Sequence, residues 1–273
     1  MSVAAVETAR ETEADLVASG VRKAFGGVVA VDNASITVSE SRISGLIGPN
    51  GAGKSTLLSI LSGFLRPDAG TVRLGELDVA RRGPATAARH GLIRTFQAAA
   101  PVRSLSVGDN VLLGMHLRFT GGPLAVLLRT PTMRAQERQA RGEVAALLED
   151  IGLSDLQDVD AGRLTFGQLR FLEIARALAA RPRLLLLDEP TAGLNTVESD
   201  RLTALITSIS GRGVGLLVVD HNVPFLFAIC DRITVMNYGS IIAEGPPSEI
   251  ETDPAVREAY LGTERIVEVA QAE

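Results

Sequence analysis

Gly48-Pro49-Asn50-Gly51-Ala52-Gly53-Lys54-Ser55-Thr56 is the stretch around which the rest of this chain is organised. It fits the pattern of a phosphate-binding loop: a glycine, four residues, Gly-Lys, and then Ser or Thr. Glycines let the backbone curl until several N–H groups converge on a phosphate oxygen. The apolar residues 43–47 before the loop are typical of a strand, and residues 56–61 after it begin a helix, whose N-terminus favours anions. The stretch therefore predicts a nucleotide-phosphate site between a strand and a helix.

Two side chains of this loop have expected roles. Lys54 is expected to reach the β- and γ-phosphates of a nucleotide, and the Ser55 hydroxyl is expected to hold Mg²⁺. The alternative is a glycine-rich turn that happens to contain a lysine. The strand before the loop and the helix after it disfavour that alternative.

Composition narrows the class of protein. The chain has 273 residues, of which 46% are hydrophobic and 22% are charged, as in an ordinary globular protein. A net charge of −5 leaves no basic footprint, so we expect no nucleic-acid partner. Cys230 is the only cysteine, which rules out an intrachain disulfide, and its apolar neighbours favour a buried thiol. No uninterrupted apolar run is long enough to span a bilayer and no secretory signal is evident, so a cytoplasmic location is expected.

A second expected strand carries two acids at its end. Residues 184–187 are four leucines, typical of a parallel strand buried on both faces, and Asp188 and Glu189 follow directly. Ligands bind beyond the carboxyl ends of such strands. Asp188 is therefore a candidate for Mg²⁺ binding, and Glu189 for the general base that activates water. The alternative is a plain acidic turn, which a neighbouring phosphate loop disfavours.

Three further candidates are weaker on their own. His221 follows the apolar residues 215–219, so it is expected at the same sheet edge, where it can bond the γ-phosphate. Residues 164–168, Leu-Thr-Phe-Gly-Gln, precede an expected helix and could bind an anion or simply cap that helix. Phe25 lies between two expected antiparallel strands, and a lone phenylalanine is more often a core residue.

The order of these motifs resembles that of an ABC transporter ATP-binding subunit. Walker A at 48–56, Gln97, a signature-like 164–168, Walker B at 184–188 with Glu189, and His221 occur in the family's order over about residues 16–262. The resemblance implies an α/β fold: a P-loop NTPase core with an antiparallel β subdomain and an inserted α-helical subdomain. It divides the chain into a disordered tail (1–15), a core lobe (16–97 and 184–262), a helical lobe (98–183) and a C-terminal tail (263–273).

The resemblance also implies roles in a head-to-tail dimer that binds ATP with Mg²⁺. Phe25 would stack on adenine, which overturns its core interpretation. Gln97 would sense Mg²⁺, take part in catalysis and contact the permease. The signature residues Thr165, Gly167 and Gln168 would touch the ATP held by the opposite subunit. The expected nucleotide-binding set is then Phe25, Gly48, Pro49, Asn50, Gly51, Ala52, Gly53, Lys54, Ser55, Thr56, Thr165, Gly167 and Gln168; the catalytic set is Lys54, Gln97, Glu189 and His221; and the metal set is Ser55, Gln97 and Asp188.

Several segments are similar to the branched-chain amino acid importer group. They are Arg94-Thr95-Phe96-Gln97, a lengthened helical lobe, residues 172–178, Ala192-Gly193-Leu194-Asn195 and Ala259-Tyr260-Leu261-Gly262. Membership implies two permease subunits, a second ATP-binding subunit, an external solute-binding protein and a peripheral place on the cytoplasmic face of the plasma (inner) membrane. Alternatives are another cargo, such as urea or lipopolysaccharide, export, or a soluble ABC ATPase without a permease.

The chain departs from the family's pattern at three places. Thr165-Phe166 stands where the general family has Ser-Gly, and Asn195 replaces the usual Asp after Walker B, which removes a charge. Ser41-Arg42 stands where Gly-Glu is common before Walker A. We expect Thr165 to keep the hydroxyl function, and Asn195 to weaken communication across the dimer.

Overall fold

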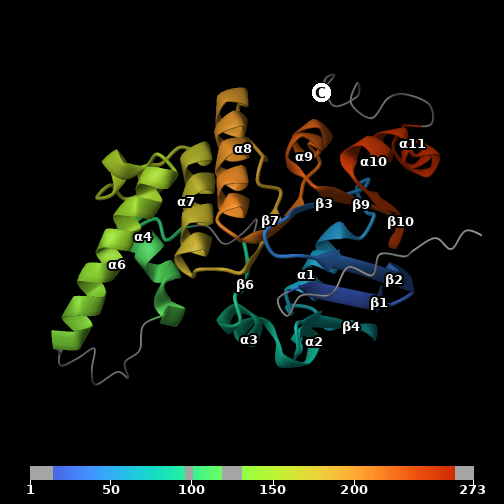
Figure 1. Ribbon diagram of the computed structural model, residues 1–273, viewed down its shortest axis with the longest axis horizontal. Helices are drawn as coiled ribbons and strands as arrows, with labels where there is room; N and C mark the ends of the chain where they lie inside the picture. Colours follow the sequence, from blue (N-terminus) through green and yellow to red (C-terminus); the bar gives the residue numbers. More distant parts are fainter. Residues whose placement is uncertain (1–14, 96–100, 119–130, 262–273) are drawn as a thin grey trace, which may run out of the picture.

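The computed structural model describes residues 15–95, 101–118 and 131–261, which form two sheets and a group of helices (Figure 1). The larger sheet has six strands in the order β10-β9-β3-β8-β7-β6. All neighbouring pairs are parallel except β9 and β10. Its strands are β3 (Ile43–Ile47), β6 (Leu92–Arg94), β7 (Leu184–Asp188), β8 (Gly215–Val219), β9 (Arg232–Asn237) and β10 (Ser240–Gly245).

The three central strands confirm the expectation of parallel strands covered on both faces. Every residue of β3, β7 and β8 is buried. Helices cover the sheet because parallel strands must be joined by crossovers that run over its faces. The helices that follow β3, β7 and β8 in the chain are α1 (Lys54–Leu61), α8 (Thr196–Gly211) and α9 (Val223–Ile229). The thiol of Cys230, at the end of α9, is buried as expected, and burial raises its pKa well above the ordinary value.

The smaller sheet is antiparallel, in the order β2-β1-β4-β5. Its strands are β1 (Leu16–Phe25), β2 (Val28–Val38), β4 (Ala69–Leu74) and β5 (Leu77–Asp78). Leu16 pairs with Val38 on one side and with Leu74 on the other, which confirms the expected antiparallel strands. One face of this sheet joins β3 and α1 in a shared apolar core, so the two sheets are packed together behind the phosphate loop.

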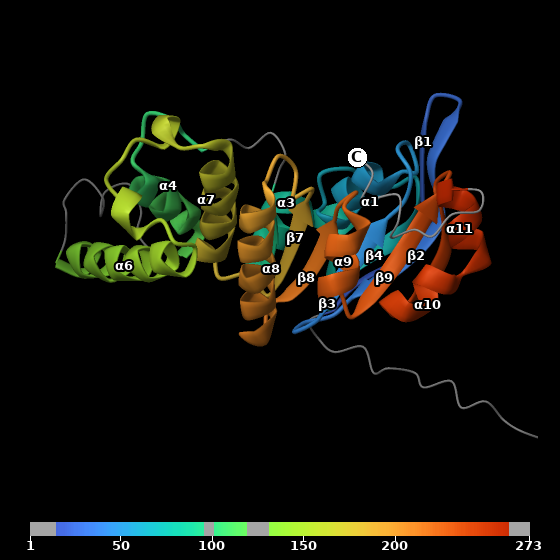
Figure 2. The same ribbon diagram turned by 90° about the horizontal axis from the view of Figure 1, so that it is seen from above.

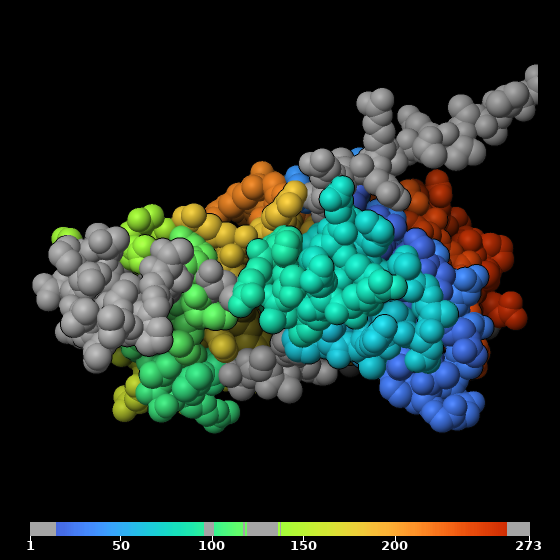
Figure 3. All heavy atoms as spheres, turned by 90° about the horizontal axis from the view of Figure 1, so that it is seen from below, coloured from blue at the N-terminus to red at the C-terminus, as the bar shows by residue number. Residues whose placement is uncertain are grey.

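Three helices form a separate group at one end of the molecule (Figures 1 and 2). They are α4 (Val107–Gly114), α6 (Pro131–Asp150) and α7 (Phe166–Ala179). Ser106 caps α4, since its hydroxyl accepts from the Asp109 N–H at 3.0 Å. Seen from below, residues 69–94 lie between this helical group and the tip of the β1–β2 hairpin (Figure 3). The helical group and the tip of the β1–β2 hairpin therefore lie at opposite ends of the molecule.

Short helices complete the described chain. They are α2 (Val79–Arg82), α3 (Pro84–Arg89), α10 (Pro247–Thr252), α11 (Pro254–Leu261), η1 (His116–Arg118), η2 (Ser154–Leu156) and η3 (Ala161–Arg163). Asp15 belongs to the folded part, because it is buried and its carbonyl accepts from Gly75 at 3.2 Å. The rest of the expected N-terminal tail, the expected lobe boundary at 97/98 and the expected C-terminal tail lie outside the described residues.

The turn before β3 has a backbone conformation that favours the glycine common at position 41, where this chain has serine. Ser41 has a φ of 59°, a left-handed conformation that favours glycine. A serine at this position costs about 1 kcal/mol of conformational energy that a glycine would avoid.

Candidate functional site

The carboxyl ends of β3, β7 and β8 meet at one edge of the large sheet. Leu46 and Asp188 both pair with Val219, so the three strands end at the same level. The phosphate loop therefore leaves β3 beside Asp188-Glu189 and Asp220-His221, as the sequence predicts. These segments are far apart in the chain, and the parallel register alone brings them together.

Strands β2 and β9 lie directly against the phosphate loop. A Cβ on Gly53 would lie 2.2 Å from the Ala30 carbonyl of β2, and one on Gly48 would lie 2.2 Å from the Met236 carbonyl of β9. Glycine is required at both positions because no larger residue permits this approach. Gly53 also has a φ of 101°, which L-residues rarely adopt. The loop is thus fixed before any ligand binds.

Lys54 lies across this loop. Its Nζ donates to the carbonyls of Gly48 at 2.6 Å and Pro49 at 3.1 Å. Burial lowers the pKa of the ammonium, and the negative charge of Glu189 opposes that shift. Lys54 and Glu189 are therefore electrostatically coupled across the sheet edge.

Asp188 is fixed by Arg94, a residue to which the sequence motifs assign no role. Arg94, in the neighbouring strand β6, donates to Asp188 Oδ2 at 2.9 Å, and both side chains are almost fully buried. The same guanidinium donates to the hydroxyls of Ser59 at 3.1 Å and Ser62 at 3.2 Å on α1. Arg94 thereby ties Walker B to the helix that follows Walker A. No local signal in the sequence marks this contact, because Arg94 and Asp188 are far apart in the chain and only the β6–β7 pairing brings them together.

Glu189 has an unusual backbone conformation. Its φ is 47°, and its N–H donates to the Val219 carbonyl at 2.7 Å. Non-glycine residues with such angles cluster at functional sites, where the surroundings hold the strain. The conformation turns the chain sharply at the end of β7, so Glu189 stands at the sheet edge instead of continuing the strand.

The buried carboxylate of Asp220 connects the loop after Walker B to the segment that carries His221. Asp220 is 1% exposed and accepts from the Thr191 N–H at 3.0 Å and the Thr191 hydroxyl at 2.7 Å. It also accepts from the Asn222 N–H at 2.9 Å. His221 itself is 65% exposed, with its Nδ1 3.7 Å from Asp220 Oδ1. The sequence motifs assign no role to Thr191 or Asp220, because their contact joins segments that are far apart in the chain.

The residues proposed for Mg²⁺ fit that ion in their chemistry. Ser55 offers an exposed hydroxyl in the first turn of α1, and Asp188 offers a carboxylate whose Oδ2 pairs with Arg94. Mg²⁺ prefers oxygen ligands and is held by one or two protein groups together with phosphates and water. Within the described residues no group of three or more His, Cys, Asp or Glu forms a dedicated metal cage.

Phe25 is a surface residue. It ends β1 and is 51% exposed, with Lys23 Nζ 5.7 Å from the centre of its ring. The interpretation of Phe25 as a core residue is therefore wrong. An exposed aromatic ring beside a cation can stack on a planar ligand.

The signature residues form the N-terminus of α7. Thr165 and Gln168 make a reciprocal capping box, with the Thr165 N–H donating to Gln168 Oε1 at 2.9 Å and the Gln168 N–H donating to Thr165 Oγ1 at 3.3 Å. A Cβ on Gly167 would meet the Glu198 carboxylate of α8 at 2.2 Å. Along the long axis of the molecule, α7 is well separated from α1 in both ribbon views (Figures 1 and 2). The chain thus keeps its signature apart from its own phosphate loop.

Two departures from the family pattern have structural explanations. Phe166 packs on Gly193, where a Cβ would lie 2.6 Å from its ring, and it stacks with Arg170 at 5.6 Å. Asn195 caps α8 by accepting from the Glu198 N–H at 3.0 Å. An asparagine serves this cap as well as an aspartate does. Gln97 lies outside the described residues.

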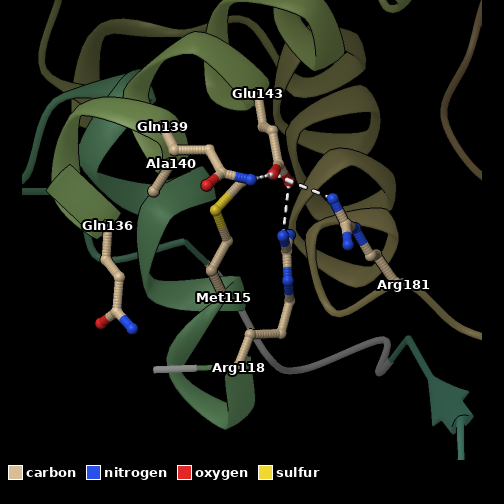
Figure 4. Close-up of a pocket in the computed structure, with 7 residues that line it drawn as sticks. All are labelled: Met115, Arg118, Gln136, Gln139, Ala140, Glu143 and Arg181. Carbon is tan, nitrogen blue, oxygen red and sulfur yellow. Dashed lines mark hydrogen bonds and ion pairs between the residues drawn. The ribbon is translucent and has the colours of Figure 1, made fainter. Parts of the chain in front are cut away.

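A separate cavity of about 450 Å³ lies within the helical group (Figure 4). Glu143 of α6 accepts from Arg118 at 2.6 Å and from Arg181 at 2.9 Å. Burial acts to raise the pKa of Glu143, but the two guanidinium groups hold it below its ordinary value. These ion pairs join α6 to the ends of η1 and α7. No residue predicted for the nucleotide site is among those that line this cavity in the described chain.

Comparison with known families and proteins agrees with this geometry. The ABC transporter family matches residues 31–192, and a second family, described as branched-chain amino acid ATP-binding cassette transporter, matches residues 240–266. The chain is 40% identical to the high-affinity branched-chain amino acid transport ATP-binding protein BraF of Pseudomonas aeruginosa, over 90% of this chain and 97% of BraF. It is 38% identical to LivG of Escherichia coli with the same coverage. It is also 37% identical to the lipopolysaccharide export system ATP-binding protein LptB of Acidithiobacillus ferridurans, over 90% of this chain and 96% of LptB.

Solved structures agree as well. A nucleotide-free ATP-binding cassette from an ABC transporter matches with a TM-score of 0.78 and 32% identity, covering 92% of this chain and all of that one. The ADP conformation of MJ1267, an ATP-binding cassette of an ABC transporter, matches with a TM-score of 0.79 and the same identity and coverage. The chain therefore belongs to the ABC transporter family, in which it is an ATPase subunit.

Proposed function

We propose that this chain hydrolyses ATP to power the import of branched-chain or other hydrophobic amino acids through partner permeases. The observation that carries the mechanism is the meeting of the phosphate loop, Asp188-Glu189 and Asp220-His221 at one sheet edge. The observation that favours this cargo is the 40% identity to BraF over nearly the whole chain. The second family match, at residues 240–266, points to the same cargo.

The proposed roles follow from chemistry at that edge. Backbone N–H groups of residues 48–56 hold the phosphates, and Lys54 exchanges its contacts with the Gly48 and Pro49 carbonyls for phosphate oxygens. Ser55 and Asp188 would hold Mg²⁺, which supplies charge neutralisation at the phosphates. Glu189 takes the proton of the attacking water, and His221, exposed and beside Asp220, contacts the γ-phosphate. For Gln97 we keep the proposed role as a sensor of Mg²⁺ that also contacts the permease.

The separation of α7 from α1 supports a shared site between two subunits. Thr165, Gly167 and Gln168 would complete the nucleotide site of the opposite ATP-binding subunit, which is a copy of this chain or a second ATPase. We further propose two permease subunits and an external solute-binding protein in the complex, with this chain peripheral on the cytoplasmic face of the membrane. None of the helices described for this chain is both long and apolar enough to cross a bilayer.

Lipopolysaccharide export is the second candidate, favoured by the 37% identity to LptB. Transport assays distinguish amino acid import from lipopolysaccharide export. In cells lacking this gene, we expect lower uptake of radiolabelled leucine, restored by the wild-type gene and not by one encoding Glu189→Gln. Unchanged uptake of leucine, isoleucine and valine, together with impaired lipopolysaccharide export, would favour the second candidate.

Replacing Phe25 by Ala is expected to raise the Kd for ATP about tenfold, because stacking on adenine is worth ~1–1.5 kcal/mol. Titration calorimetry of the purified chain measures this. Phe64→Ala is a matched control, since Phe64 is also exposed, at 54%, and has no proposed role at the site. An unchanged Kd for Phe25→Ala would contradict adenine stacking.

A further inference from the structure

Arg94 is a buried cation beside the site to which the proposed mechanism gives no part. It is the last residue of β6 and pairs in parallel register with Leu186 of β7, two residues before Asp188. Paired residues of parallel strands share a face of the sheet, and so do residues two apart in one strand. Arg94 and Asp188 therefore lie on the same face. That face packs against α1, since Leu186 belongs to the same apolar core as Leu57 and Leu58.

The guanidinium of Arg94 contacts two elements at once. Its Nη2 donates to Asp188 Oδ2 at 2.9 Å, and its Nη1 donates to the hydroxyls of Ser59 at 3.1 Å and Ser62 at 3.2 Å on α1. The side chains of Arg94 and Asp188 are only 8% and 10% exposed. A planar guanidinium that is hydrogen-bonded at both ends has a fixed orientation. Arg94 therefore sets the spacing between the Asp188 carboxylate and α1.

The contact with α1 continues to the first turn of that helix. The Ser59 hydroxyl, which accepts from Arg94, itself donates to the Ser55 carbonyl at 2.7 Å. Because this hydroxyl donates in one direction and accepts in another, its position is fixed by both partners. The two residues proposed to hold Mg²⁺, Ser55 and Asp188, are thus connected through one guanidinium.

Mg²⁺ makes such a connection useful. The ion requires nearly octahedral oxygen ligands at about 2.0–2.1 Å, so ligands from a helix and a strand must be held at a defined spacing. Arg94 occupies Oδ2 of Asp188, which leaves Oδ1 as the oxygen that can face the ion. Groups that hydrogen-bond to the ligands of a metal commonly change its affinity by about 10–100-fold when they are replaced.

We propose that Arg94 is a positioning residue for Mg²⁺, which holds Asp188 and the Ser55 turn of α1 at the spacing that the ion requires. This inference rests on the proposed binding of ATP and Mg²⁺ at the sheet edge. Arg94 acts on the ligands and contacts neither the ion nor the nucleotide. Its effect therefore falls on the binding of nucleotide with Mg²⁺ and not on the binding of nucleotide without metal.

The test is Arg94→Lys, which keeps the positive charge beside Asp188. A single ammonium cannot reach the carboxylate and both hydroxyls together, so the connection to α1 is lost. Titration calorimetry with the non-hydrolysable ATP analogue AMP-PNP gives one Kd in Mg²⁺ and one in EDTA. We expect the Kd in Mg²⁺ to rise about tenfold and the Kd in EDTA to change less than twofold. An equal rise in both values, or no rise in either, would overturn the proposal.

Arg232→Lys is the matched control. Arg232 is the first residue of β9, so it lies at the opposite end of that strand from the edge that carries the site, and it pairs with Glu244 on the surface. We expect both of its Kd values to equal those of the wild type.

A second variant works even if Arg94→Lys fails to fold. Ser59→Ala removes one hydroxyl contact and leaves the ion pair between Arg94 and Asp188. The Kd in Mg²⁺ should rise about threefold, since one hydrogen bond is lost, and the Kd in EDTA should stay constant. Thr207→Val is its control, because the Thr207 hydroxyl makes the same type of bond to the Thr203 carbonyl on the exposed face of α8.

The wild-type chain separates failure of this role from failure of the proposed function. If it binds AMP-PNP equally well with and without Mg²⁺, the positioning role of Arg94 is wrong, while nucleotide binding at residues 48–56 stands. If it binds AMP-PNP under neither condition, the proposed function itself fails.

Discussion

Replacing Glu189 by Gln is expected to lower ATP turnover about 10²–10⁴-fold and to leave the Kd for ATP nearly unchanged. Glutamine keeps the size of the side chain and cannot accept the proton of the attacking water. The backbone contact of residue 189 with the Val219 carbonyl does not involve the side chain, so it should persist. Phosphate release, measured for the chain alone and in its transporter complex, gives the turnover, and calorimetry gives the Kd.

Glu244→Gln is the matched control. Glu244 lies on β10, four places from β7 in the order of the sheet, and pairs with Arg232 at 3.3 Å on the surface. We expect its turnover to equal that of the wild type. Unchanged turnover in Glu189→Gln would remove Glu189 from the role of general base.

The Glu189→Gln chain also shows whether the partner subunit is a second copy of this chain. Because the variant does not hydrolyse bound ATP, a dimer that ATP holds together should persist. Light scattering after size-exclusion chromatography with and without ATP measures its mass. Conversion of monomer to dimer would mean that this chain supplies both signatures itself. A chain that binds ATP and stays monomeric would instead require a different ATPase partner.

Replacing Lys54 by Met is expected to raise the Kd for ATP about 100-fold. A hydrogen bond between an ammonium and a phosphate is charge-assisted, and its loss costs ~2–3 kcal/mol. Calorimetry measures the Kd, and thermal unfolding without nucleotide supplies the control. Because burial disfavours the charged form of Lys54 in the folded chain, removing the ammonium should not lower the melting temperature.

The two readouts separate binding from folding. Weak ATP binding with an unchanged melting temperature supports the proposed role of Lys54. A Kd within threefold of the wild type would exclude Lys54 from contact with the phosphates. Lys54→Arg should restore binding only in part, since a planar guanidinium cannot replace a compact ammonium inside a closed loop.

Local sequence was sufficient to locate most elements near the site. Residues 43–47 and 215–219 were predicted as strands with the bounds that the structure has, because a short apolar run between turn residues has few other stable conformations. The helix expected after residues 164–168 begins within that stretch, at Phe166. Residues 164–168 were expected either to bind an anion or to cap that helix, and the reciprocal bonds of Thr165 and Gln168 confirm the cap.

The sequence by itself determined the phosphate loop, the acids after the buried strand and their order along the chain. These features depend on residues that are neighbours in the chain, where glycine conformations, apolar runs and helix caps act locally. The tertiary structure alone decided which distant groups support them. Arg94 reaches Asp188 and Thr191 reaches Asp220 only after the parallel register and helix packing have brought separate segments together. A single sequence carries no local signal for such contacts, because their energy comes from burial and hydrogen bonds that exist only in the folded chain.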